Sequence, residues 1–283
     1  MGLNSSSFSW GPQVRWFGLK GGESGKGTCT ALVFDNRGVG NSGYPRGPYT
    51  TSGMAEDVIC LLDYLGWTEK RQLNVVGISL GGMIAQELAY RIPHRISSLL
   101  LAVTTPGGHI WNNFLRCLKG LQCLTKLTFT PAPENKVPTV LDMLFPKVWL
   151  DEKAKSDPHA EWNGNTEDNK QGKTNSDVQA EGFLRRVTIT KPQLFMGHIS
   201  QMAAALTHYV SPERLAYIAA NAMKNGLSKS DAESNSRRVE LQQWEETGHG
   251  IHAQREDQFN LLVERCVREG KALLESGFEG RDV

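Results

Sequence analysis

The residue with the clearest chemical potential is Ser79, which stands between two glycines in the stretch NVVGISLGGMIAQELAY. An apolar run precedes it and a helix-forming run follows it. Gly77 and Gly81 are small enough to let a strand and a helix approach each other closely at a sharp turn, so the serine hydroxyl can point outward. This order is typical of a nucleophile elbow, and we expect Ser79 to be a nucleophile.

The helix that follows Ser79 also has a chemical consequence. Its N-terminus would place free backbone N–H groups and the positive end of the helix dipole beside the serine hydroxyl. We therefore expect the N–H of Leu80 to donate a hydrogen bond to an oxyanion that forms on a substrate carbonyl.

A serine hydroxyl is a weak nucleophile unless a base accepts its proton, so a histidine must lie close to it. The stretch ETGHGIHAQREDQF offers His249 and His252. His249 follows an alternating apolar stretch at residues 239–244, where a loop at the carboxyl edge of a sheet would begin. We expect His249 to be the general base, whereas the position of His252 is more typical of a histidine that packs locally.

Apolar runs and helix-like runs alternate along the first part of the chain. Short apolar runs that end in turn residues suit buried parallel strands, and apolar residues spaced by three and four suit helices. Strands are expected at residues 31–34, 73–77 and 98–103, and helices at 54–65 and 82–91. The order strand, helix, strand, helix, strand predicts an α/β fold with a mostly parallel sheet flanked by helices.

The pattern changes in the second part of the chain, where residues 106–225 are rich in helix-like segments. A polar run at about 156–178 interrupts them, and we expect this run to be a disordered or mobile loop. Alternation then returns at 239–244, which predicts another strand, and an amphipathic helix is expected at about 257–275.

The composition excludes several classes of function. The chain has 283 residues, 39% of them hydrophobic, and 31 basic against 30 acidic residues give a formal charge of +1. This balance gives no indication of nucleic-acid binding, and no apolar run approaches the roughly 18 residues of a membrane span. Five scattered cysteines without metal-type spacing favour a reducing compartment, so we expect a cytoplasmic protein without a stable membrane anchor.

No metal site is expected from the histidines. His198 and His208 lie in one helical stretch, but their spacing turns them away from each other around the helix axis. We assign both to the surface or the packing of the helical part.

Three blocks of sequence resemble one superfamily: VFDNRGVGNSG, VVGISLGGMIAQELAYRIPHRISSLLL and WEETGHGIHAQREDQFNLLVER. They are similar to the α/β-hydrolase superfamily, in the branch of small serine esterases and related acyl hydrolases. The resemblance implies Ser79 as the nucleophile, His249 as the general base, a small-molecule acyl substrate, and no metal or organic cofactor. It gives Asp35 and Arg37 a mainly structural role in a turn.

The resemblance also implies a domain organisation. Residues 1–105 would be the N-terminal part of the hydrolase core and residues 226–283 its C-terminal part. Residues 106–225 would be a helical lid inserted over the active site, with the mobile loop at about 156–178 inside it.

The beginning of the chain departs from the family pattern. The stretch MGLNSSSFSWGPQVRWF resembles the oxyanion loop and the helix after it, so Leu3 or Asn4 would supply the second oxyanion N–H. The strands that usually precede this loop are absent, so we expect an incomplete core, with Met1 equivalent to an internal methionine of a longer ancestor.

The acid of the catalytic triad is the second departure. In this superfamily it lies between the serine and the histidine in the chain, normally just after a strand. The sequence predicts no such strand, which leaves Asp231 as the plausibly placed aspartate and Glu233 as a second choice. Glu245 and Glu246 are too close to the histidine in sequence to reach the far side of its ring. An exposed loop acid is an equally good interpretation of Asp231.

Three functions are compatible with these residues. The first is a serine hydrolase that cleaves carboxylic ester or related acyl bonds through an acyl-enzyme. The second is a non-catalytic or truncated hydrolase-like protein, either a binding module or a defective gene product. The third is an acyltransferase on the same scaffold, in which an alcohol replaces water as the acceptor.

Overall fold

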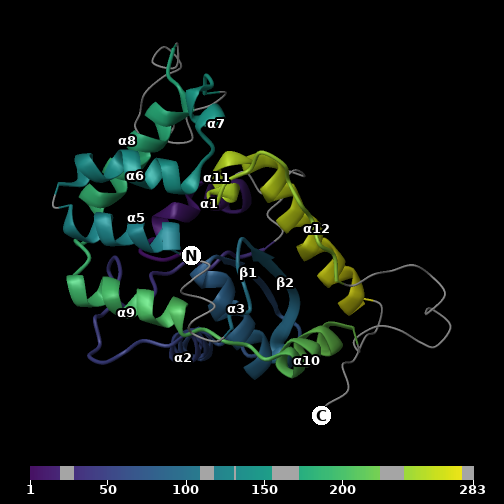
Figure 1. Cartoon of the computed structure of the whole chain (residues 1–283). Coiled ribbons are helices and arrows are strands. Elements are labelled where there is room, and N and C mark those ends of the chain that lie inside the picture. Colours follow the sequence, from purple (N-terminus) through teal and green to yellow (C-terminus); the bar gives the residue numbers. More distant parts are fainter. Residues whose placement is uncertain (20–28, 109–117, 131, 155–171, 224–238, 276–283) are drawn as a thin grey trace.

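The sheet of this protein consists of two parallel strands, β1 (Leu73–Ile78) and β2 (Ile96–Ala102). The computed structural model describes residues 1–19, 29–108, 118–130, 132–154, 172–223 and 239–275 (Figure 1). The pairing runs from Leu73 opposite Ile96 to Ile78 opposite Ala102, so both strands end at the same edge of the sheet. The two expected strands at residues 73–77 and 98–103 are thereby confirmed, as is their parallel order.

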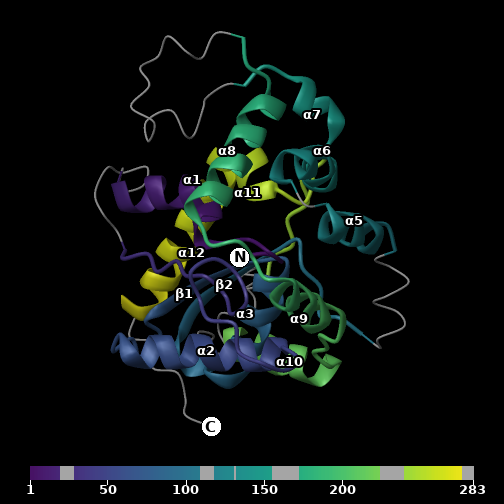
Figure 2. The same cartoon turned by 90° about the vertical axis from the view of Figure 1, so that its left-hand side faces the viewer.

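Helices cover both faces of this sheet (Figures 1 and 2). On one face, Leu73 and Ile96 belong to a buried cluster with α2 (Thr51–Tyr64) and α3 (Leu80–Arg91). On the opposite face, Ile78, Leu100 and Ala102 form a second cluster with Phe259 and Val263 of α12 (Glu256–Glu275). Each strand thus contributes apolar side chains to both faces, as expected for a parallel sheet that is covered on both sides.

The predicted helices of the core are confirmed, and their ends have local causes. The Thr50 side chain caps α2 by accepting a hydrogen bond from the Gly53 N–H at 3.0 Å. Helix α3 ends at Arg91, ahead of Pro93, and the short 3-10 turn η3 (Pro93–Arg95) then leads into β2.

The first residues form a loop followed by short helical turns, η1 (Ser7–Trp10), α1 (Gly11–Val14) and the π-helical η2 (Arg15–Leu19). The Asp35 side chain fixes this segment, because it accepts hydrogen bonds from the N–H of Ser7 at 2.6 Å and from the N–H of Asn41 at 2.8 Å. The turn that contains Asp35 therefore has a clear structural role, as the sequence resemblance implied.

A group of helices, which we call the lid helices after the sequence prediction, stands over the carboxyl edge of the sheet (Figure 1). Its described helices are α5 (Leu118–Phe129), α6 (Pro133–Leu144), α7 (Lys147–Asp151), α8 (Asn175–Ile189) and α9 (Phe195–Leu206). Helix α10 (Pro212–Met223) returns the chain to the core, where it packs against α3. The short helix α11 (Ile251–Gln254) precedes α12.

Two strand predictions are wrong. Residues 31–34 form no strand and pair with none among the described residues, although Leu32 and Phe34 pack against the core. Residues 239–244 also form no strand, and Val239 and Leu241 are 60% and 84% exposed. Alternating side chains create a strand only where a neighbouring backbone offers hydrogen bonds.

The polar run expected at about 156–178 ends earlier than predicted. Residues 155–171 lie outside the described part of the chain, but α8 already begins at Asn175. A capping box starts this helix: Thr174 accepts from the N–H of Asp177, and Asp177 accepts from the N–H of Thr174.

Candidate active site

Ser79 occupies the sharp turn between β1 and α3, with φ of 55° and ψ of −120°. A positive φ is strained for a residue with a side chain and is maintained only where neighbours fix the backbone. The Ser79 N–H donates to the carbonyl of Ala102 at 3.0 Å, and the Thr104 hydroxyl donates to the Ser79 carbonyl at 2.8 Å. This strained and firmly held turn between a strand and a helix is the backbone geometry that the predicted nucleophile elbow requires.

Gly77 permits this turn through close packing of strand and helix. A Cβ atom at position 77 would lie 2.6 Å from the carbonyl oxygen of Gly81 and 2.7 Å from the Cα of Gly82. Both atoms belong to the backbone and cannot move aside, so a glycine is required at the end of the strand.

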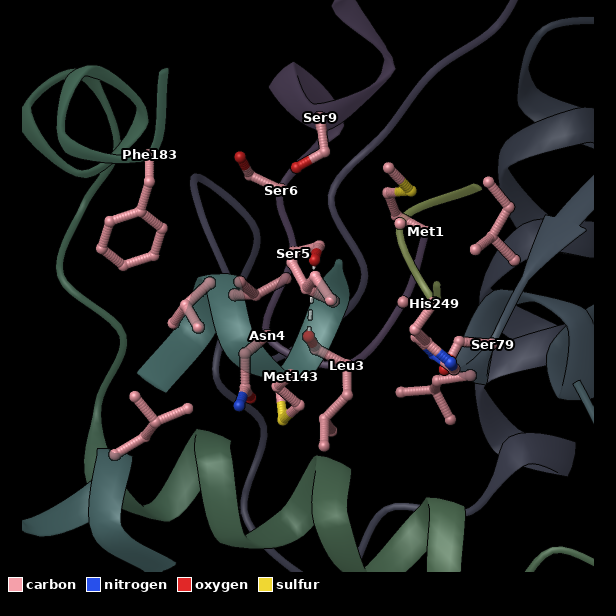
Figure 3. A pocket seen from close by; sticks show the side chains of 18 of the residues that line it. Met1, Leu3, Asn4, Ser5, Ser6, Ser9, Ser79, Met143, Phe183 and His249 are labelled. Atoms are coloured by element: carbon pink, nitrogen blue, oxygen red, sulfur yellow. Dashed lines mark hydrogen bonds between the residues drawn. The ribbon is translucent and has the colours of Figure 1, made fainter. Parts of the chain in front are cut away.

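His249 lies on the loop that leads into α11. The N–H of Gly248 donates to Gln254 Oε1 at 2.7 Å, and the N–H of Gly250 donates to the carbonyl of Leu144 at 2.8 Å. These contacts fix the loop on both sides of the histidine. The side chains of His249 and Ser79 point toward one another in the cavity (Figure 3).

The protein around His249 favours the neutral imidazole. Burial lowers the pKa of His249 below its ordinary value. A neutral ring is the form that can accept the proton of a serine hydroxyl.

His252 has a different environment from His249. Its ring packs edge-on against Trp10, with ring centroids 5.8 Å apart, and against Phe259 at 6.3 Å. Burial is the largest of the effects that lower the pKa of His252 to about 3. These contacts fit the expectation that His252 is a locally packed residue.

The cavity that holds Ser79 and His249 has a volume of about 1260 Å³. Its walls come from the N-terminal loop, the carboxyl ends of β1 and β2, and the lid. Leu3 lies near Ser79 and His249, whereas Phe183 of α8 points into the cavity from the lid (Figure 3). The lid therefore forms a wall that a substrate would meet.

Two backbone N–H groups remain candidates for an oxyanion hole. Leu80 is the first residue of α3, so its N–H has no acceptor inside the helix. Of the two N-terminal candidates, Asn4 uses its N–H to donate to Gln201 Oε1 at 3.0 Å. The N–H of Leu3, which lines the cavity, is thus the better placed candidate for the second donor of the oxyanion hole.

His198 is a cavity residue that the sequence interpretation missed. It is buried on α9, and its Nδ1 lies 2.7 Å from Asn4 Nδ2 while its Nε2 lies 2.6 Å from Thr128 Oγ1. His198 therefore connects the N-terminal loop to two lid helices. Its partners are distant in sequence, so helical spacing alone gave no signal of this role. His208, in contrast, is fully buried beside Thr51 and is a packing residue, as expected.

The proposed triad acid, Asp231, lies outside the described residues, as does Glu233. Among the residues that the structure describes, no carboxylate contributes to the pKa shift of His249, which has burial as its cause. The third member of the triad therefore stays a prediction.

The described residues contain no group of three or more His, Cys, Asp or Glu side chains that could hold a metal ion. In the same part of the chain, no helix is both long enough and apolar enough to cross a membrane.

Comparison with known proteins identifies the family. Residues 26–170, just over half of the 283-residue chain, match the family described as alpha/beta hydrolase fold. The chain belongs to this family. Solved structures of similar fold include a thermophilic esterase from Thermogutta terrifontis (TM-score 0.59, 15% identity, 95% of this chain and 88% of that one). The enol-lactonase from Burkholderia xenovorans LB400 has a TM-score of 0.56 at 20% identity, over 94% and 88% of the two chains.

Curated relatives of this α/β hydrolase align with shorter parts of it. A poly(3-hydroxyalkanoate) depolymerase from Ectopseudomonas oleovorans is 43% identical over 76 residues, which are 27% of this chain and 26% of that protein. The 3-oxoadipate enol-lactonase 2 of Acinetobacter baylyi is 40% identical over 102 residues, 36% of this chain and 34% of that protein. The alignments thus span well under half of the length of these relatives.

Proposed function

We propose that this α/β hydrolase cleaves carboxylic ester or related acyl bonds, with Ser79 as the nucleophile and His249 as the general base. The observation that carries the proposal is the strained serine of the elbow, which points toward a histidine in a shared cavity (Figure 3). The relatives named as a depolymerase, an enol-lactonase and an esterase support the same reaction class, since a lactone is a cyclic ester.

The reaction would proceed in two halves. His249 accepts the proton of Ser79 Oγ while that oxygen bonds to the substrate carbonyl carbon, and the N–H groups of Leu80 and Leu3 stabilise the resulting oxyanion. Collapse of this intermediate breaks the ester bond, and the departing alcohol takes the proton from His249. Water then attacks the acyl-enzyme, again with His249 as base, and releases the carboxylic acid and free Ser79.

The test is labelling with an active-site fluorophosphonate, which forms a covalent bond to an activated serine oxygen. The wild type should be labelled at Ser79, whereas Ser79→Ala and His249→Ala should lose the label. Ser98→Ala is the matched control, because that hydroxyl bonds Asn74 on the sheet and does not line the cavity. A folded wild type that takes no label would contradict the proposal.

The competing function is a hydrolase-like protein that binds ligands without turnover. Two observations favour this competing function. Within the described residues the sheet has two paired strands, and no carboxylate there shifts the pKa of His249. Loss of an orienting acid typically reduces turnover by about ten-thousandfold. Absence of labelling together with binding of a small acyl compound would support this second function.

A further inference from the structure

One face of α8 lines the cavity. The residues that do so are spaced by three and four along the helix, which places them on one side of it. They are Gln179, Phe183, Arg186 and Val187, together with the C-cap residue Thr190. Phe183 points into the cavity (Figure 3), so Arg186, one turn further along the same face, brings a positive charge to an otherwise largely apolar wall.

The guanidinium of Arg186 has no partner among the described residues, where it makes neither an ion pair nor a side-chain hydrogen bond. Other half-buried arginines of this protein are paired. Arg91 and Arg214 share the carboxylate of Glu87, and Arg71 donates to two backbone carbonyls at 3.1 and 2.6 Å. Among the half-buried arginines that the structure describes, Arg186 is thus an exception, because the others make at least one ion pair or hydrogen bond.

Burial makes this exception costly. It lowers the pKa of Arg186 to about 10, which still leaves the side chain charged at neutral pH. A half-buried charge without a partner loses part of its hydration with no compensating contact, and groups of this kind concentrate at binding sites. The energetic cost would be offset when an anion occupies the cavity.

The charge of Arg186 acts on the segment that carries His249. It contributes to lowering the pKa of His252, which is three residues after His249 in the chain. The other basic residues of the wall are Lys136 and Lys191. Of the acidic ones, Glu256 already pairs with Arg15 at 3.7 Å, and Asp142 makes no ion pair with Arg186.

We propose that Arg186 binds a carboxylate of the substrate, so the preferred substrates are esters or lactones whose acyl part carries a second, ionised carboxyl group. This inference rests on the proposed acyl hydrolysis at Ser79. A guanidinium matches a carboxylate through two parallel hydrogen bonds, which fix the orientation of the acyl chain as well as adding affinity. The apolar surface of Phe183 and Val187 on the same helix face suits the methylene groups between the two carboxyl ends.

The test compares two esters of equal chain length, 4-nitrophenyl hydrogen glutarate and 4-nitrophenyl pentanoate, with the Ser79→Ala variant as the blank for spontaneous hydrolysis. In Arg186→Gln the ratio of kcat/KM for the anionic ester to that for the neutral ester should fall about ten- to a hundredfold. Arg185→Gln is the matched control, since it removes the neighbouring charge from a residue that does not line the cavity, and it should keep the wild-type ratio. An unchanged ratio in Arg186→Gln would overturn the inference.

A binding measurement separates this inference from the proposed function. If neither ester is hydrolysed, the proposal for Ser79 fails, and calorimetry with glutarate on the folded wild type and on Arg186→Gln decides the remaining question. Glutarate binding that disappears in Arg186→Gln supports carboxylate recognition. Equal binding by both proteins, or binding by neither, overturns it.

Discussion

The side-chain amide of Asn4 lies 2.7 Å from Nδ1 of His198, although the two residues belong to the N-terminal loop and to lid helix α9. A second contact joins the same elements, because the N–H of Asn4 donates to Gln201 Oε1 at 3.0 Å. Leu3, the candidate oxyanion donor, directly precedes Asn4. The lid therefore determines the position of the loop that would complete the oxyanion hole.

Replacement of His198 by alanine should reduce kcat more than it changes KM. In the proposed mechanism the contact positions an N–H group that acts in the transition state, and a small displacement of such a group costs about ten- to a hundredfold in rate. Turnover of 4-nitrophenyl pentanoate measures the effect. His198→Gln keeps an acceptor and a donor and should restore part of the rate, whereas the exposed His94→Ala should change neither constant. Equal losses in both His198 variants would argue against a positioning role.

Gly77→Ala should lower the free energy of unfolding by about 1–3 kcal/mol, because the new methyl group would meet backbone atoms of α3 at 2.6 and 2.7 Å. Urea unfolding of the variant and the wild type gives this difference. A suitable control is Gly43→Ala, where no atom lies within 4 Å of the added Cβ. Equal stability losses in the two variants would contradict the close approach at the elbow.

The pH profile of kcat/KM should fall on the acid side at a pH below about 6.5, the ordinary pKa of histidine. Burial lowers the pKa of His249, so this proposed base stays neutral and able to accept a proton until the pH drops through that lowered value. Rates of ester hydrolysis at a series of pH values test this. If kcat/KM instead falls at a pH at or above the ordinary histidine pKa, a carboxylate such as Asp231 would lie beside the His249 ring, since a negative charge raises the pKa of a histidine.

The stability of the fold should decrease as the pH falls from about 6.5 to about 4. Burial, the largest effect on His208, lowers its pKa to about 4, with Glu87 opposing the shift and Arg214 adding to it. Between these values the unfolded chain binds a proton that the folded chain does not, so acid favours unfolding. In His208→Gln the pH slope of the unfolding free energy should become smaller by up to about 1.4 kcal/mol per pH unit. An unchanged slope in urea experiments would contradict this account.

Local features of the fold were predictable from sequence. The elbow at Ser79 depends on glycines within two residues of it, and helix α12 was expected at 257–275 and is found at Glu256–Glu275. Such elements form because neighbouring residues determine backbone conformation and an apolar helix face. The two strands of the sheet were also identified from their apolar runs to within two residues at their ends.

Features that need a distant partner were not predictable in the same way. The apolar run at 31–34 and the alternating run at 239–244 are both typical of strands, but they obtain no ladder of backbone hydrogen bonds in the described structure. The roles of His198 and Arg186 were likewise not predictable from the sequence. The role of His198 depends on its contacts with Asn4 and Thr128, and that of Arg186 depends on the lack of a partner in the cavity.

The sequence by itself determined the family, the serine at the turn and the helices of the core, because short-range spacing encodes each of these. It also gave the pairing of this serine with His249 as a hypothesis. Only the tertiary structure decided which strands find partners, how the lid fixes the N-terminal loop, and which charge enters the cavity. The physical reason is that hydrogen bonding and burial depend on atoms brought together from distant parts of the chain.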